Sequence, residues 1–237
     1  MKQGFTLSEV LITLGIVGIV AVLTIPGVMK NYKNRLYTAQ LEKVYSQISD
    51  ATQAIMADEH VDSFYETTAA GATTYKDGAT DNQEPQTGVG YFLTKYFKAV
   101  KKDCFKADKS GCMTSNANTY KTIGNASITS NASNYCIQTV SGAAICGSYN
   151  TKVASSGEPC MSLVIDVNGM AAPNVAGRDI FSLDVYKNGS ILDYNTGCQI
   201  TNADRASLCT TGATSSLYSA ANGCLVNVME AGWKMEY

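Results

Sequence analysis

The acidic side chain of Glu9 stands in an otherwise apolar segment. Between residues 5 and 25 it is the one ionisable side chain. A helix over this segment would be about 31 Å long at ~1.5 Å per residue, close to the ~30 Å hydrocarbon core of a bilayer. Placing a charged side chain at mid-bilayer costs ~2.5 kcal/mol or more, although a position near a helix end costs less. We therefore expect Glu9 to pair with a positive charge on a neighbouring chain.

Eight cysteines form the second set of residues with a chemistry of their own, and all lie between Cys104 and Cys224. An even number confined to one region is typical of a disulfide framework, which persists in oxidising compartments. The sequence lacks the Cys-x-x-Cys pairs that hold zinc, and His60 is its single histidine. We predict that this region lies outside the cytoplasm.

Strand register predicts one of the disulfides. Residues 135–139 and 143–146 have the pattern of two strands, and the loop between them ends in Gly142. A three-residue hairpin loop favours glycine at its left-handed third position, so this register places Cys136 opposite Cys146. Spacing alone suggests that the remaining pairs are Cys104–Cys112, Cys198–Cys209 and Cys160–Cys224, although it leaves other connectivities open.

The residues around Glu9 resemble the prepilin motif of type IV pilins and type II secretion pseudopilins. That motif is a short basic leader ending in glycine, then Phe-Thr-Leu-x-Glu, then an apolar helix with a proline near its far end. The residues that match are Gly4, Phe5, Thr6, Leu7, Glu9 and Pro26. The resemblance covers about the first 30 residues, and both residue types and spacing fit.

The resemblance implies a processing step and an assembly step. A prepilin peptidase would cut between Gly4 and Phe5 and N-methylate Phe5, and Glu9 would then pair with the Phe5 amine of an adjacent subunit. An α-amine is largely cationic at neutral pH, which suits this pairing. The implied partners are the prepilin peptidase, like pilin or pseudopilin subunits, an inner-membrane assembly platform and the lipid bilayer. The implied location is the bacterial inner membrane, single-pass, with the C-terminal head periplasmic or extracellular.

Simpler interpretations of the apolar segment fit less well. A secretory signal peptide has a shorter apolar core and an Ala-x-Ala-like site after it, and residues 22–27 offer no such site. A plain single-span anchor would not need Glu9. Lys30, Lys33 and Arg35 follow the segment, and positive-inside counting would favour a cytoplasmic C-terminus. The cytoplasm-facing peptidase and the cysteines favour the opposite orientation.

The chain divides into four predicted parts: a leader (1–4), a transmembrane helix (5–25), an amphipathic continuation of that helix (26–60) and an extracytoplasmic globular head (61–237). We expect Gly15, Gly18 and Pro26 to weaken or break the helix, because glycine and proline disfavour helix interiors. In the continuation, apolar residues recur at three- and four-residue spacing and can cover a sheet; these are Leu41, Val44, Tyr45, Ile48, Ala51, Ile55 and Met56.

The head has the pattern of a short helix followed by strands. We predict helices over residues 91–100 and 221–232, and further strands over 161–167, 181–186 and 190–194. The predicted fold class is α+β and pilin-like: a long N-terminal transmembrane and amphipathic helix packed on an antiparallel sheet, with a disulfide-stapled head.

Oxygen-bearing side chains between two of these strands offer a weak metal candidate. Asp166, Asn168 and Asp179 could hold Ca²⁺, which takes oxygen ligands. Major pseudopilins carry a calcium loop near their C-terminus, but this segment lies earlier and lacks the pattern of an EF-hand. Turns between strands are the simpler interpretation, and we expect no cofactor.

The remaining features argue against enzymatic or nucleic-acid functions. The sequence has no nucleophile-elbow, phosphate-loop or dinucleotide motif, and its net charge of −2 does not suit nucleic-acid binding by bulk charge. We predict a structural filament subunit of a type II secretion pseudopilus or a type IV pilus, not an enzyme. The alternative is a membrane-anchored monomeric surface module for binding or adhesion. The motif does not separate the two machines, nor a major from a minor subunit.

Overall fold

The computed structural model describes residues 4–76, 84–108, 110–116, 119–128, 135–151, 157–199, 209 and 216–237. Residues 1–3 of the predicted leader lie outside the described residues. Chain contacts divide the protein into two compact units, Met1–Leu36 and Tyr37–Tyr237. The second unit is the head, and it begins within the first helix.

The elements follow one another in the order helix, sheet, short helices. The helices are α1 (Leu7–Asp58), the 3₁₀ turn η1 (Phe64–Glu66), α2 (Gly88–Tyr96), α3 (Leu217–Ala220) and α4 (Cys224–Glu230). The strands are β1 (Ala99–Lys102), β2 (Phe105–Lys106), β3 (Met113–Thr114), β4 (Tyr135–Thr139), β5 (Ala144–Asn150), β6 (Cys160–Asp166), β7 (Ile180–Val185) and β8 (Ile191–Asp193).

Helix α1 passes through Gly15, Gly18 and Pro26 without interruption. The break that we expected at these residues therefore does not occur in the single chain. Proline removes one amide donor, so Pro26 leaves one helical bond unmade while the neighbouring bonds keep the helix. The Thr24 hydroxyl also donates to the carbonyl of Val20 (2.9 Å), inside the same stretch.

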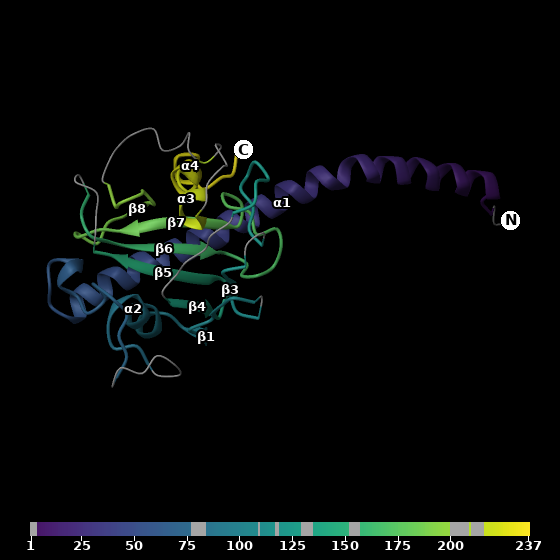
Figure 1. Ribbon diagram of the computed structural model, residues 1–237. Helices are drawn as coiled ribbons and strands as arrows, with labels where there is room; N and C mark the ends of the chain where they lie inside the picture. The colour runs from purple at the N-terminus through teal and green to yellow at the C-terminus, as the bar shows by residue number, and fades with distance from the viewer. Residues whose placement is uncertain are drawn as a thin grey trace. The chain divides into compact units, whose positions relative to one another are not determined.

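Among the described residues, six strands form one antiparallel sheet in the order β1-β4-β5-β6-β7-β8 (Figure 1). Strand neighbours in the sheet follow the chain from β4 to β8, as in a meander. Short β2 and β3 pair in parallel beside it. Every residue of β6 and β7 is buried, so the centre of the sheet is covered on both faces.

The head part of α1 covers one face of the sheet, and Figure 1 shows it passing behind the strands. Its buried residues recur every three or four positions, which places them on one side of the helix. They are Tyr37, Thr38, Leu41, Val44, Ile48, Ala51, Thr52 and Ile55. They join a core that includes Ile145, Leu163, Ile165 and Leu183 from the sheet. The predicted apolar stripe is thus confirmed, with Tyr45 and Met56 packed at its margin.

A second core covers the opposite face of the sheet. Alternate residues of the same strands, such as Cys146 and Val164, pack there with α3 and with Tyr120. The two disulfides Cys104–Cys112 and Cys136–Cys146 lie in this layer. The head is therefore a helix, a sheet and a disulfide-containing layer of loops and short helices.

The β4–β5 hairpin has the predicted register. Cys136 pairs with Cys146 across the two strands, and the two residues form a disulfide. Gly142 has a positive φ of 93°, and a Cβ there would meet no atom within 4 Å, so conformation alone explains this glycine. The local pair Cys104–Cys112 also forms as predicted.

Two predicted disulfides are wrong. The structure pairs Cys160 with Cys198 and Cys209 with Cys224, in place of Cys198–Cys209 and Cys160–Cys224. Cys160 begins β6, and the segment after β8 returns to that strand and brings Cys198 within 5.9 Å between Cα atoms. The spacing of the cysteines does not predict this pairing, because the pairing depends on contacts between residues that are distant in the sequence.

The helix predicted over residues 91–100 is partly wrong. Helix α2 ends at Tyr96, and Phe97 is extended (φ −118°, ψ 140°). Ala99 then pairs with Thr139, so the last predicted helical residues form the edge strand β1. The helix predicted over 221–232 is shorter in the structure, where α4 covers Cys224–Glu230 and begins after Gly223, which has a left-handed φ of 80°. Helix α3 ends at Ala220, before the predicted range.

We expect Ile48→Ala to lower the free energy of unfolding of the head by about 2–5 kcal/mol, because a fully buried side chain would leave a cavity between α1 and the sheet. The measurement is chemical denaturation of the full chain in detergent micelles. The fluorescence of the single tryptophan, Trp233, follows unfolding, since its ring packs on Tyr45 of α1 (5.5 Å between centroids). The control is Gln47→Ala, an exposed neighbour on α1. Equal midpoints for the two variants would contradict this packing.

Candidate processing and assembly site

The peptide bond between Gly4 and Phe5 lies in a segment without regular structure, directly before α1. Phe5 is 89% exposed. A Cβ added at Gly4 would meet no atom within 4 Å, so nothing in the described chain requires glycine at that position. The bond that the motif predicts to be cut is thus accessible in the described chain.

Thr6 and Glu9 cap the start of α1 reciprocally. The Thr6 amide and the Thr6 hydroxyl both donate to Glu9 Oε2 at 2.8 Å, and the Glu9 amide donates to Thr6 Oγ1 at 3.3 Å. This is a capping box, which satisfies amides that have no partner in the first helical turn. We did not predict this box from the sequence, although the Thr-x-x-Glu spacing is its usual signal.

The capping box fixes where the Glu9 carboxylate lies. Both side-chain bonds end on Oε2, so Oε1 can accept from a second group, such as an amine of another chain. The carboxylate is held at the N-terminal end of the helix, a few residues from Phe5. This arrangement keeps the charge oriented toward the end of the helix, where the backbone amides favour a negative group.

The apolar side chains of the first part of α1 are exposed in the single chain. They include Leu11, Leu14, Val17, Ile19 and Leu23, each more than half exposed. Among the described residues, α1 is the one helix long and apolar enough to cross a membrane. Exposed apolar surface of this extent marks contact with lipid or with other proteins.

The three predicted calcium residues come together at the base of the β6–β7 connection. Asp166 ends β6, Asp179 directly precedes β7, and neither side chain is accessible to solvent. Asn168 donates its amide to Asp166 Oδ1 (3.2 Å). Asn174, which is not one of the three predicted ligands, donates its amide to Asp179 Oδ2 (2.9 Å).

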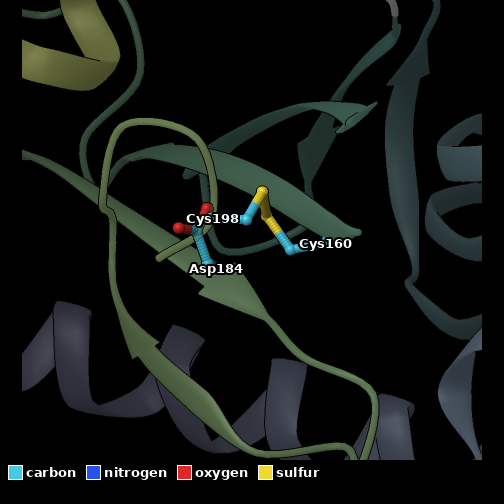
Figure 2. Close-up of side chains that lie close together, drawn as sticks. All are labelled: Cys160, Asp184 and Cys198. Atoms are coloured by element: carbon cyan, nitrogen blue, oxygen red, sulfur yellow. A yellow bond between two sulfur atoms is a disulfide. The ribbon is translucent and has the colours of Figure 1, made fainter. Parts of the chain in front are cut away.

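A second cluster surrounds the Cys160–Cys198 disulfide (Figure 2). Asp184 of β7 lies beside it, and one atom from each of the three residues falls within 4.8 Å of the others. Cysteines in a disulfide carry no thiolate to bind a metal. The structure therefore gives these residues the role of a structural tie and not that of a metal site.

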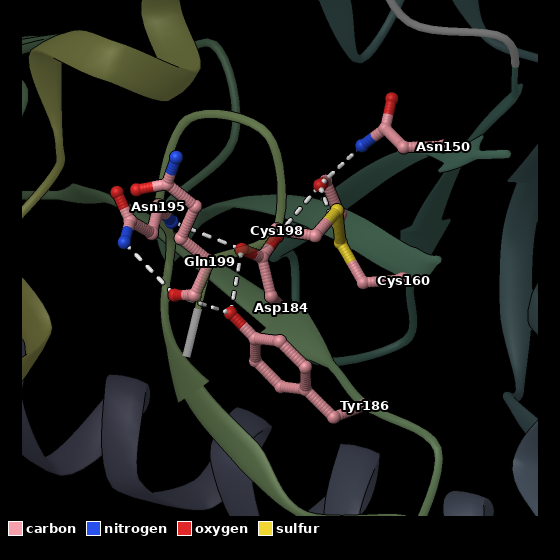
Figure 3. The surroundings of a disulfide bond; sticks show 8 residues. Asn150, Cys160, Asp184, Tyr186, Asn195, Cys198 and Gln199 are labelled. Carbon is pink, nitrogen blue, oxygen red and sulfur yellow. Dashed lines mark hydrogen bonds between the residues drawn. A yellow bond between two sulfur atoms is a disulfide. The ribbon is translucent and has the colours of Figure 1, made fainter. Parts of the chain in front are cut away.

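Asp184 is a buried acid whose oxygens are well supplied with donors (Figure 3). It accepts from Ser162 Oγ (2.6 Å) and from the amide of Asn195 (2.9 Å), and the Tyr186 hydroxyl lies at 3.5 Å. Asn195 in turn donates from Nδ2 to the carbonyl of Gln199 (2.9 Å). The network binds the segment after β8 to the sheet, next to the disulfide that closes the same contact.

A family model described as the prokaryotic N-terminal methylation motif matches residues 1–25. This motif is the signature of type IV pilins and pseudopilins, so the resemblance seen around Gly4, Phe5 and Glu9 is confirmed. No curated protein and no solved structure matches the chain. The long apolar N-terminal helix, the antiparallel sheet and the four disulfides of the head confirm the α+β, pilin-like fold class.

We expect Asp184→Ala to destabilise the head by about 2–4 kcal/mol, because the Ser162 hydroxyl and the Asn195 amide would lose a buried acceptor. Denaturation of the full chain in micelles measures this change. Glu158→Ala is the control, since Glu158 is an exposed acid two residues from Cys160; it should alter stability by no more than about 0.5 kcal/mol. Similar small effects for both variants would show that the network does not hold the segment.

Proposed function

We propose that this protein is a prepilin-like structural subunit that is cut between Gly4 and Phe5 and then assembles with like subunits into a filament. The observation that carries the proposal is the methylation motif at residues 1–25, with the single acid Glu9 in an apolar helix. The filament would be a type II secretion pseudopilus or a type IV pilus.

The surroundings of Gly4 support the processing step. No described residue lies close enough to require glycine there, and the bond that follows is exposed and outside the helix. A peptidase that binds the backbone closely at this bond would require a residue without a side chain. Cutting at this bond creates an amine at Phe5, next to the capping box of Thr6 and Glu9.

The exposed apolar surface of α1 supports the assembly step. In the inner membrane lipid would cover side chains such as Leu14 and Val17, and in a filament neighbouring helices would cover them. A carboxylate in that apolar packing needs a cationic partner, because an unpaired buried charge is strongly destabilising. The Phe5 amine of the next subunit is such a partner, and this pairing would set the axial position of one subunit against another.

The disulfides support an extracytoplasmic head. All eight cysteines are paired in the structure, and such bonds persist in oxidising compartments. The head would lie in the periplasm or outside the cell, on the far side of the inner membrane from the peptidase. The prepilin peptidase, like subunits and an inner-membrane assembly platform are the partners of this proposal, and its role is structural, not enzymatic.

We expect the mature protein to begin with N-methylated Phe5 and Gly4→Val to retain the leader, because its side chain would obstruct the peptidase. Mass spectrometry of the membrane fraction from the native cell measures both outcomes. A wild-type protein that still carries Met1 in its working form would refute the processing step.

We expect Glu9→Ala to be processed normally but to reduce filaments in the sheared surface or pseudopilus fraction by at least about tenfold, because the Phe5 amine would lose its carboxylate partner at each contact between subunits. The matched control is Ser8→Ala, the neighbouring position, which should assemble as the wild type does. Normal assembly of Glu9→Ala would refute the pairing of Glu9 with the Phe5 amine, whereas full surface binding without filaments in the wild type and the variant alike would favour the monomeric surface module.

A further inference from the structure

Three side-chain oxygens near the end of β6 are buried and have no hydrogen-bond partner among the described residues. They are Asp166 Oδ2, Asn168 Oδ1 and Asn174 Oδ1. All three belong to β6 or to the connection that leads to β7. A buried polar atom without a partner costs free energy, so several in one place indicate a ligand that supplies the missing interaction.

Two buried carboxylates face the same region. Asp166 and Asp179 are both fully buried, and neither forms an ion pair among the described residues. The described residues supply these two carboxyl groups with backbone amide donors but with no ion-pair partner.

The oxygens are linked by short contacts. Asn174 and Val175 donate their amides to the two oxygens of Asp179, at 2.9 and 2.7 Å. Asn168 donates its amide to Asp166, and its side chain also interacts with Asp179. Burial raises the pKa of the Tyr37 hydroxyl on α1, and the nearby Asp179 and Asp166 raise it further, so this hydroxyl belongs to the same surroundings. Arg178 lowers the same pKa, but it forms no ion pair with either acid in the described part of the chain.

The connection that carries these residues is held in place by its backbone. Val167 donates to the carbonyl of Asp179 (2.9 Å), which closes the base of the connection. Its far side is tied to Lys121, which donates to the carbonyl of Asn174 (3.0 Å) and accepts from Ala176 (2.9 Å). The C-terminal Tyr237 also donates its hydroxyl to Gly177 (2.6 Å). The oxygens therefore keep their positions without needing the ligand to order the chain.

The geometry points to a calcium site formed by Asp166, Asn168, Asn174 and Asp179 at the base of the β6–β7 connection. Carboxylate and amide oxygens are the ligands that Ca²⁺ takes, in sets of six to eight with flexible geometry. Mg²⁺ requires near-ideal octahedral geometry and releases its water reluctantly, so it suits a site of buried amide and carboxylate oxygens less well. Ca²⁺ would place a positive charge beside the two acids and would bind the three oxygens that have no hydrogen-bond partner in the described chain.

Asp184 shows that buried acids in this sheet do not all call for a metal. It lies in β7 with full burial, like Asp166 in the neighbouring strand, but its oxygens receive donors from Ser162 and Asn195. The difference between the two acids is the supply of donors and not the degree of burial. Asp184 is therefore the internal control for the calcium proposal, which does not depend on filament assembly.

Calorimetry and thermal unfolding test the proposal on the full chain in detergent micelles after treatment with EGTA. We expect one Ca²⁺ to bind per chain, and millimolar CaCl₂ to raise the unfolding temperature by about 5–10 °C over EGTA. Millimolar MgCl₂ should have a much smaller effect. No binding and equal unfolding temperatures would overturn the proposal, and an equal effect of MgCl₂ would overturn the assignment to calcium.

Variants locate the site. Asp166→Asn and Asp179→Asn keep the shape of each side chain, and each should weaken calcium binding by at least about tenfold. Asp184→Asn removes the charge of the control acid and should bind calcium as the wild type does. If the aspartate variants fail to fold, Asn168→Ala and Asn174→Gly remove neutral ligands, and glycine suits the left-handed φ of 56° at Asn174. Wild-type affinity in every folded variant would place the ion elsewhere and refute the site.

Discussion

The structure depends on what covers the apolar side chains of α1. A helix satisfies its own backbone hydrogen bonds, so it can lie in lipid, and the surroundings of its side chains decide where it is stable. In the head, Leu41, Ile48 and Ile55 are covered by the sheet. Earlier in the same helix, Leu14 and Val17 remain exposed. One helix therefore has two requirements: the sheet covers the side chains of its end, and lipid or other helices would have to cover those of its beginning.

Acidic side chains mark the places where this chain meets a second requirement, that of a partner for a charge held away from water. Asp193 meets it within the fold, because its carboxylate accepts from the amides of Gly223 and Val226 (2.8 and 2.9 Å) and so ties β8 to the start of α4. Asp184 meets it through Ser162 and Asn195. Glu9 accepts from Thr6 through Oε2 alone, and Asp166 Oδ2 is buried without a donor among the residues that the structure describes. These are the two acids for which we propose a partner outside the chain.

The four disulfides make two kinds of contact: two of them close short loops, and two of them hold the chain after β8. Cys104–Cys112 and Cys136–Cys146 join residues close in sequence and lie beneath the loops on the sheet face opposite α1. Cys160–Cys198 and Cys209–Cys224 hold the chain after β8 against the sheet and against α4. Covalent ties of this kind replace part of the packing that would otherwise hold loops in place.

By itself the sequence determined what short-range patterns encode: the processing motif, the long helix with its apolar stripe, the strands of the meander and the register that places Cys136 beside Cys146. Only the tertiary structure decided the features that join distant residues. Ala99 and Val100 continue a helical pattern, yet pairing with β4 makes them a strand. Cys160 pairs with Cys198 because the segment after β8 folds back onto β6. Tyr37 and Asn174 lie near Asp166 and Asp179 because α1 and the β6–β7 connection pack at the same end of the sheet. Local spacing determines backbone preferences and which side chains share a face of a helix or strand. Contacts between distant residues depend instead on the free energy of the whole packed structure, so they cannot be predicted from one segment.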